Sequence, residues 1–107
     1  MIFMKELQNK TRNIVKKLPL LNKVEHRFMD LVEEVGELST AIMYFEKFKS
    51  GRYEGKYTKD DISDALSDIL FDLFVIADKY DLEVDKEYTK MLERLDKRVE
   101  EGEFEKK

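Results

Sequence analysis

Apolar residues recur at alternating spacings of three and four along residues 28–45, and this period is the strongest constraint on the fold. The series consists of Phe28, Leu31, Val35, Leu38, Ile42 and Phe45. Such a spacing places the apolar side chains on one face of an α-helix. Few helix breakers interrupt the chain, which has one Pro and four Gly among 107 residues. The pattern therefore predicts long helices, and we see no strand alternation.

Four helices with short connections account for the whole pattern. Their expected ranges are about 3–18, 22–49, 59–80 and 85–101. Pro19 ends the first helix, because proline disfavours helical backbone at the residue before it. Thr58 is the expected N-cap of the third helix, with Asp61 three residues later as in a capping box. Asp85 is the expected cap of the fourth helix.

The predicted fold is a single all-α domain over residues 1–107, arranged as a four-helix bundle. Its motif-bearing core covers about 22–101, and 102–107 form a polar tail. Between Ile69 and Ala77 the only polar residue is Asp72. A helix that is apolar nearly all round is buried on several sides, at a bundle centre or a subunit interface. We therefore expect a homo-oligomer, either a dimer or a tetramer.

Composition excludes several classes of site and partner. The chain has no Cys and a single His, which rules out thiolate zinc sites, cysteine nucleophiles and multi-histidine metal sites. Any metal must be held mainly by carboxylates, which favours hard cations such as Mg²⁺, Mn²⁺ or Ca²⁺. Twenty basic residues are interspersed with twenty-four acidic ones, for a net charge of -4. No basic face for nucleic acid stands out.

Nothing in the sequence indicates a membrane or an export signal. No apolar run approaches the roughly 20 residues that a membrane-spanning helix requires. The segment Met1–Lys5 lacks the apolar core of a signal peptide. We therefore expect a cytoplasmic protein without a membrane partner.

Two groups of acidic residues fall on matching flanks of the second and third helices. At about 100° per residue, Glu34 and Glu37 share one flank of the apolar stripe, and Glu33 points further out. The corresponding flank of the third helix carries Asp61, Asp68 and Asp72, with Ala65 among them and Asp64 at the outer edge.

If these two flanks pack together, four or five carboxylates converge. Like charges at short range repel strongly in a low dielectric, so the cluster needs a cation, protons or water. Magnesium that also bridges the phosphates of a substrate satisfies this need. The competing interpretation is that the acids are ordinary solvated residues, with Asp61 serving only as a cap. Asp72 is harder to explain this way, because charged groups rarely enter an apolar run without a partner.

These segments resemble the MazG-like, all-α nucleotide pyrophosphatase superfamily. EEVGEL at residues 33–38 resembles its EExxE motif. LSDILFDLFVIADKYDLEV at residues 66–84 resembles the segment in which an ExxD motif begins a buried helix that is followed by a turn. LERLDKRVEEGEF at residues 92–104 resembles its closing basic and aromatic helix. The resemblance covers residues 29–104, most of the chain.

The resemblance implies a helical oligomer that hydrolyses nucleoside triphosphates to monophosphate and pyrophosphate, for example in house-cleaning of non-standard or deoxy nucleotides. It implies Mg²⁺, for which Mn²⁺ is a substitute, held by Glu34, Glu37 and Asp68. Glu33 matches the first motif Glu, as a catalytic residue that orients water. Ala65 stands where the ExxD motif has its Glu. This departure leaves one metal ligand missing.

Three aspartates are candidates for the missing ligand. Asp72 lies one turn beyond Asp68 on the same flank, and we include it among the predicted metal ligands. Asp61 lies one turn before Ala65, and Asp64 is adjacent to it at a poorer angle. An alternative register would take residues 61–64 as a DxxD version of the motif.

Basic and aromatic residues suitable for a nucleotide lie in two places. Positively charged side chains meet phosphate oxygens through charge-assisted hydrogen bonds, and aromatic rings stack on bases. The basic candidates are Lys47, Lys49, Arg52 and Lys56 around the loop 50–57, and Arg94, Lys97 and Arg98 in the last helix. The aromatic candidates are Tyr53, Tyr57 and Phe104, for which core or surface packing is the competing role.

Two other interpretations compete with the enzyme. In the first, the site is degraded at Ala65, and the chain is a MazG-like helical oligomer that binds a nucleotide or protein partner without hydrolysis. In the second, the chain is a plain helical bundle with chance acidic spacing.

Overall fold

The computed structural model describes residues 3–18 and 23–105, and these contain only helices and connections. The helices are α1 (Met4–Lys17), α2 (Val24–Phe45), α3 (Lys59–Lys79) and α4 (Val84–Glu100). The prediction of an all-α fold with four helices is confirmed. The expected break at Pro19 and the expected start of the second helix at residue 22 lie outside the described residues. None of the described helices is long and apolar enough to span a bilayer.

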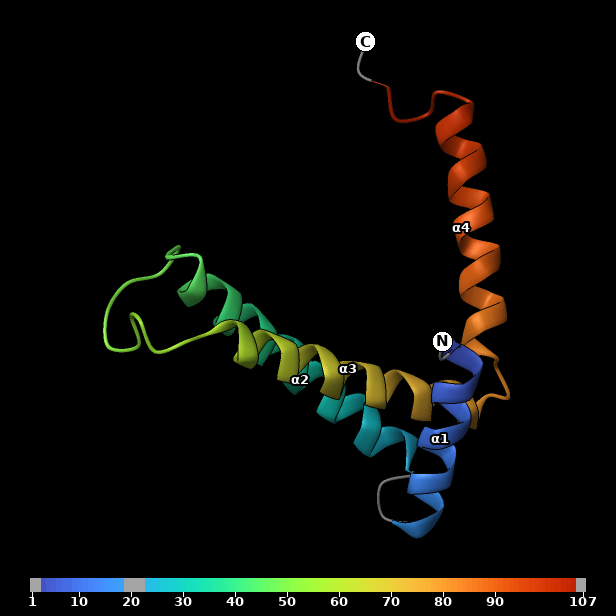
Figure 1. Ribbon diagram of the computed structural model, residues 1–107, viewed down its shortest axis with the longest axis horizontal. Helices are drawn as coiled ribbons and strands as arrows, with labels where there is room; N and C mark the ends of the chain where they lie inside the picture. The colour runs from blue at the N-terminus through green and yellow to red at the C-terminus, as the bar shows by residue number, and fades with distance from the viewer. Residues whose placement is uncertain (1–2, 19–22, 106–107) are drawn as a thin grey trace.

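Helices α2 and α3 form an antiparallel hairpin, and the other two helices lie at one end of it (Figure 1). The α2–α3 contact is the most extensive in the molecule, whereas α1 packs against α3 and α4 packs mainly against α1. Helix α4 runs away from the hairpin (Figure 1). The radius of gyration is 17.4 Å, against about 13 Å for a compact domain of this length. A single chain therefore does not close the predicted four-helix bundle.

The ends of α2 and α3 use residues in the left-handed region of backbone space. Lys47 has φ of 63° and Asp81 has φ of 55°. After each of them, a backbone N–H reaches back into the helix. Phe48 donates to the carbonyl of Met43 at 2.8 Å, and Leu82 to that of Ala77 at 2.9 Å. This is the Schellman arrangement, which satisfies the last carbonyls of a helix. It ends α2 at Phe45, four residues before the predicted end.

The two N-termini that the sequence assigned a cap behave differently. At α3, the predicted capping box is confirmed, and the Asp61 carboxylate accepts a hydrogen bond from the backbone N–H of Thr58 at 2.7 Å. At α4, the prediction of Asp85 as cap is wrong, because Glu83 is the N-cap residue and its side chain makes no capping bond. The backbone N–H of Val84 is bound instead by Gln8 of α1.

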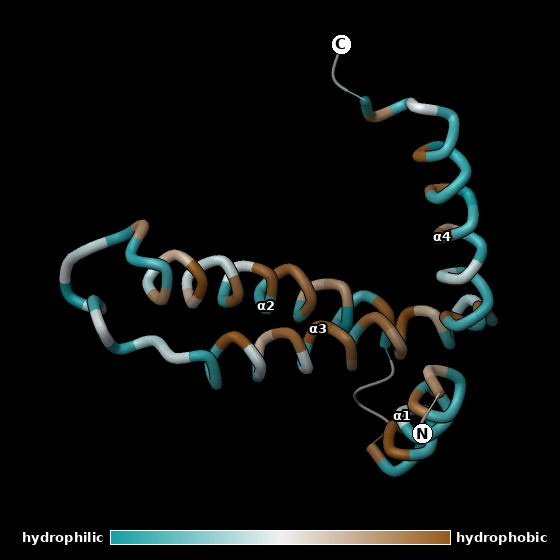
Figure 2. Tube along the Cα trace, turned by 45° about the horizontal axis from the view of Figure 1, so that its top comes forward, coloured by the Kyte–Doolittle hydropathy of each residue, from teal (hydrophilic) through white to brown (hydrophobic). Residues whose placement is uncertain are grey.

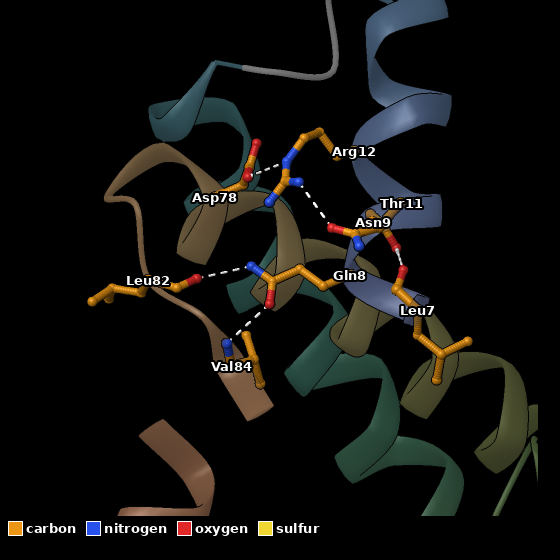
Figure 3. A network of polar contacts seen from close by, with 8 residues as sticks. All are labelled: Leu7, Gln8, Asn9, Thr11, Arg12, Asp78, Leu82 and Val84. Carbon is orange, nitrogen blue, oxygen red and sulfur yellow. Dashed lines mark hydrogen bonds and ion pairs between the residues drawn. The ribbon is translucent and has the colours of Figure 1, made fainter. Parts of the chain in front are cut away.

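Gln8 ties α1 to the turn between α3 and α4 (Figure 3). Its Oε1 accepts from the N–H of Val84 at 2.9 Å, and its Nε2 donates to the carbonyl of Leu82 at 2.8 Å. The side chain is buried, with both polar atoms paired. Next to it, Arg12 forms an ion pair with Asp78 of α3. Helix α1 therefore fixes the connection from which α4 departs.

Buried apolar residues are few, and large apolar surfaces remain exposed. The buried apolar side chains are Val15, Ala41, Ala65, Phe74 and Val75. On α3, Leu66, Leu70 and Leu73 remain 43–49% exposed, although this helix was predicted to be buried on several sides. Hydrophobic residues follow α2 and α3 over much of their length, and α4 is mostly hydrophilic (Figure 2). Exposed apolar surface of this kind is typical of helices that meet another chain.

Candidate functional site

Two small residues allow the acidic flanks of α2 and α3 to face a common cleft. Ala41 of α2 is 2% exposed and Ala65 of α3 is 5% exposed. Small side chains at a helix contact leave room beside them, so the longer side chains on either side border an open space. The resulting cleft has a volume of about 800 Å³. It is lined by Glu33, Gly36, Glu37, Thr40, Ala41, Tyr57, Asp61, Asp64, Ala65 and Asp68.

Five of the predicted site residues line this cleft. They are Glu33, Glu37, Asp61, Asp64 and Asp68. The two segments singled out in the sequence therefore border one cleft. Glu33, expected to point further out than Glu34, lines the cleft, whereas Glu34 does not. Ala65 lies in the middle of the acidic wall that α3 contributes, at the position where the motif has a Glu.

Glu34 is half-buried next to the cleft and does not line it. Burial, together with the nearby carboxylates of Glu37, Asp68 and Asp30, raises the pKa of Glu34 to about 7. Within the described residues, its buried Oε2 atom has no hydrogen-bond partner. A buried carboxylate oxygen among like charges is stabilised by a proton or a cation.

Asp72 lies outside the cleft, although it was predicted to be a metal ligand. Its side chain is fully buried, and its Oδ1 is 3.0 Å from Nη1 of Arg27 on α2. Burial and the neighbouring Asp30 raise the pKa of Asp72, Arg27 lowers it, and the net result is a pKa of about 7. A guanidinium therefore occupies the position of a counter-ion here. Arg27 lies seven residues before Glu34 and therefore shares its flank of α2, but this spacing alone does not say which residue of α3 it meets.

The cleft side chains do not already surround a common point. Among the described residues, no group of three or more His, Cys, Asp or Glu side chains is close enough to hold a metal. Mutual repulsion separates carboxylates that share no cation. The charged side chains that line the cleft are nevertheless all carboxylates, and beside the cleft Oε2 of Glu34 is buried and unpaired among the described residues. This donor set fits a hard dication such as Mg²⁺.

The phosphate-binding candidates separate into two regions. Arg52 and Lys56 are exposed in the loop that leads to Tyr57, and Lys49 lies 5.9 Å from the ring centre of Tyr44. Lys97 and Arg98 lie on α4, which diverges from the hairpin (Figure 1).

Arg98 already has local partners at the end of α4. It donates two hydrogen bonds to Glu103, at 2.8 and 2.9 Å, and its guanidinium lies 4.9 Å from the ring centre of Phe104. None of the basic candidates lines the cleft, and the loop candidates are the ones that directly precede its lining residue Tyr57 in the sequence.

Three tyrosines pack together where the loop meets the cleft. The rings of Tyr44 and Tyr57 are stacked, with centroids 5.4 Å apart and planes 10° apart. Tyr53 meets Tyr44 edge to face at 5.9 Å. The sequence pattern suggested Tyr53 and Tyr57 as nucleotide-binding candidates but missed Tyr44, which lies on the last turn of α2 and anchors the other two rings.

Comparisons of this chain with protein-family models, with curated proteins and with solved structures find no match. The resemblance to the MazG-like superfamily therefore stays a prediction from the sequence motifs.

Proposed function

We propose that this chain is a magnesium-dependent nucleoside triphosphate pyrophosphohydrolase. The observation that carries the proposal is the acidic cleft, which receives carboxylates from both motif-bearing helices. Soluble nucleoside triphosphates carry several negative charges and enter an acidic cleft only together with a dication. The resemblance of residues 33–38 and 66–84 to the MazG-like motifs supports the same reaction.

In this proposal, Glu37 and Asp68 would hold the ion from the two helices that border the cleft, and Glu34, half-buried beside the cleft, is the third predicted ligand. Mg²⁺, when bound, neutralises the phosphate oxygens and makes the α-phosphorus more electrophilic. Glu33 orients a water molecule towards that phosphorus. Addition of water breaks the bond between the α-phosphorus and the oxygen that bridges to the β-phosphorus, and yields a monophosphate and pyrophosphate.

The ligand that replaces the missing motif Glu is most simply Asp64. Asp72 is held by Arg27, and Asp61 already accepts the hydrogen bond of the capping box. Asp64 is exposed and lines the cleft one residue from Ala65. It is the one of the three aspartates whose carboxylate is not used in a contact described above.

The proposal includes assembly into a dimer or tetramer. Apolar side chains on α2, α3 and α4 remain exposed in one chain, among them Phe28, Val32, Leu70 and Leu92. The radius of gyration also exceeds that of a compact domain of this length. A second copy covering these faces would complete a bundle that one chain leaves open.

A second candidate function is binding without hydrolysis, by a cleft whose catalytic ligand set is degraded. Ala65 favours it, because this residue lies inside the cleft and offers no oxygen to a metal. In that case a nucleotide would still bind with magnesium, and no pyrophosphate would be released.

The decisive experiment measures pyrophosphate release from a panel of ribo- and deoxyribonucleoside triphosphates, with and without Mg²⁺. Wild type is compared with Glu37→Gln, and with Glu93→Gln on the exposed surface of α4 as a matched control. We expect magnesium-dependent release that is lost in Glu37→Gln and retained in Glu93→Gln. Nucleotide binding without release from any member of the panel would support the second candidate function.

A further inference from the structure

The tyrosine cluster lies at one end of the acidic cleft. Tyr57 is both a member of the cluster and a residue of the cleft lining. Tyr44 covers one face of its ring at 5.4 Å, with the two planes 10° apart. Tyr57 therefore contributes to the cleft a part of its surface that Tyr44 does not cover. The ring of Tyr57 is held against Tyr44, and the residue is only half-buried where it borders the cleft.

Along the chain, the aromatic residue of the cleft comes before its acidic residues on α3. Tyr57 precedes α3, and the acidic residues of that helix follow it from Asp61 to Asp68. At roughly 1.5 Å per residue, Asp61 and Asp68 are separated by about 10 Å along the helix axis. A nucleoside triphosphate has the same order, with a flat base at one end and phosphates at the other. The volume of about 800 Å³ is also within the usual range for small-molecule sites.

We propose that the ring of Tyr57, fixed against Tyr44 at the loop end of the acidic cleft, is the stacking platform for the base of the nucleotide. This inference rests on the proposed function and specifies the substrate class of the same site. Stacking on an aromatic face tolerates every base, because each base has a π-face. The cleft therefore accepts different nucleoside triphosphates and discriminates against phosphate chains that lack an aromatic group.

The test compares two ligands that share phosphates and differ in the base. One is α,β-methylene-ATP, in which the bond to be cleaved is blocked, and the other is inorganic tripolyphosphate. Both are titrated in the presence of Mg²⁺ by calorimetry. The variants are Tyr57→Leu, which removes the ring, and Tyr57→Phe, which retains it. Tyr80→Leu is the control, because Tyr80 is 63% exposed at the opposite end of α3.

We expect Tyr57→Leu to weaken α,β-methylene-ATP by about 5- to 150-fold, the usual loss when one stacked ring is removed. Tyr57→Phe and Tyr80→Leu should bind it as wild type does. Tripolyphosphate should bind all four proteins equally, and this result also shows that the cleft of each variant is folded.

Three outcomes would overturn the inference. An equal loss of both ligands in Tyr57→Leu would make the ring a structural part of the cleft. Undiminished binding of α,β-methylene-ATP to Tyr57→Leu would exclude stacking. A wild-type chain that binds neither ligand, or binds tripolyphosphate as tightly as the nucleotide, would exclude base recognition. Hydrolysis is decided separately by pyrophosphate release, so a binding protein without activity would still satisfy the inference.

Discussion

The two ends of the α2–α3 hairpin differ in the surroundings of their carboxylates. At one end, Asp72 is fully buried and paired with Arg27 at 3.0 Å. At the loop end, five carboxylates line an open cleft. A buried acid that the fold requires is given a cation by the protein itself. The cleft acids are left accessible, which is what a site for an external cation requires.

The largest expected effect is a loss of stability when the ion pair between Arg27 and Asp72 is broken. Replacing Arg27 by Met leaves Asp72 buried without a counter-charge, and removing one partner of a buried pair costs about 3–5 kcal/mol of unfolding free energy. Urea denaturation at fixed protein concentration measures the loss. The double variant Arg27→Met with Asp72→Leu should recover most of it, because an apolar pair of similar volume replaces the ion pair. A double variant no more stable than Arg27→Met would contradict this account.

The pair of Arg27 and Asp72 also illustrates why the sequence alone suggested Asp72 as a metal ligand. An isolated Asp in an apolar run indicates a partner, and the sequence does not say whether that partner is a metal or an arginine. The choice depends on which residue of α2 lies opposite, and therefore on the register of the hairpin. Arg27 becomes the evident partner only when the antiparallel register of α2 and α3 is known.

Other features were predictable from the sequence when they depend on neighbouring residues, and were missed when they depend on distant contacts. The apolar period of residues 28–45 and the capping box of Thr58 are local, and both were predictable. The left-handed residues Lys47 and Asp81 carry no sequence signal, because a Gly usually occupies that position. The bond from Val84 to Gln8 joins residues 76 apart, so the sequence around α4 gave no indication of it.

At the cleft end, the next largest effect should come from adding magnesium. A ligand at 100 times its Kd stabilises the state that binds it by about 2.7 kcal/mol. We expect a stabilisation of this order for wild type, measured by thermal unfolding in Mg²⁺ against Na⁺ of equal ionic strength. Asp68→Asn should abolish it, and Arg27→Met should retain it despite a lower starting stability. Equal stabilisation of wild type and Asp68→Asn would show that magnesium does not bind in the cleft.

A smaller effect is expected from restoring the motif residue with Ala65→Glu. Position 65 is 5% exposed, and a polar group buried without a partner costs about 1–3 kcal/mol. The metal-free variant should therefore be less stable than wild type. Magnesium should offset this loss, because the added carboxylate lies among the other cleft acids. Ala65→Gln, which has the same size without the charge, is the matched control. A loss that magnesium leaves unchanged would mean that this position does not face the ion.

The smallest expected effect is a difference in pH dependence at the Arg27 end. Because the pKa of Asp72 is raised from 3.8 to about 7, the folded state retains a proton there that the unfolded state releases. Stability should therefore fall as pH rises from about 4 to about 7. Asp30 is the nearest acid that raises this pKa, so Asp30→Asn should flatten the fall by a fraction of a proton. Urea midpoints between pH 4 and 8, without magnesium, measure the slopes. Equal slopes in the two proteins would show that Asp72 does not titrate in this range and is already held as a carboxylate by Arg27.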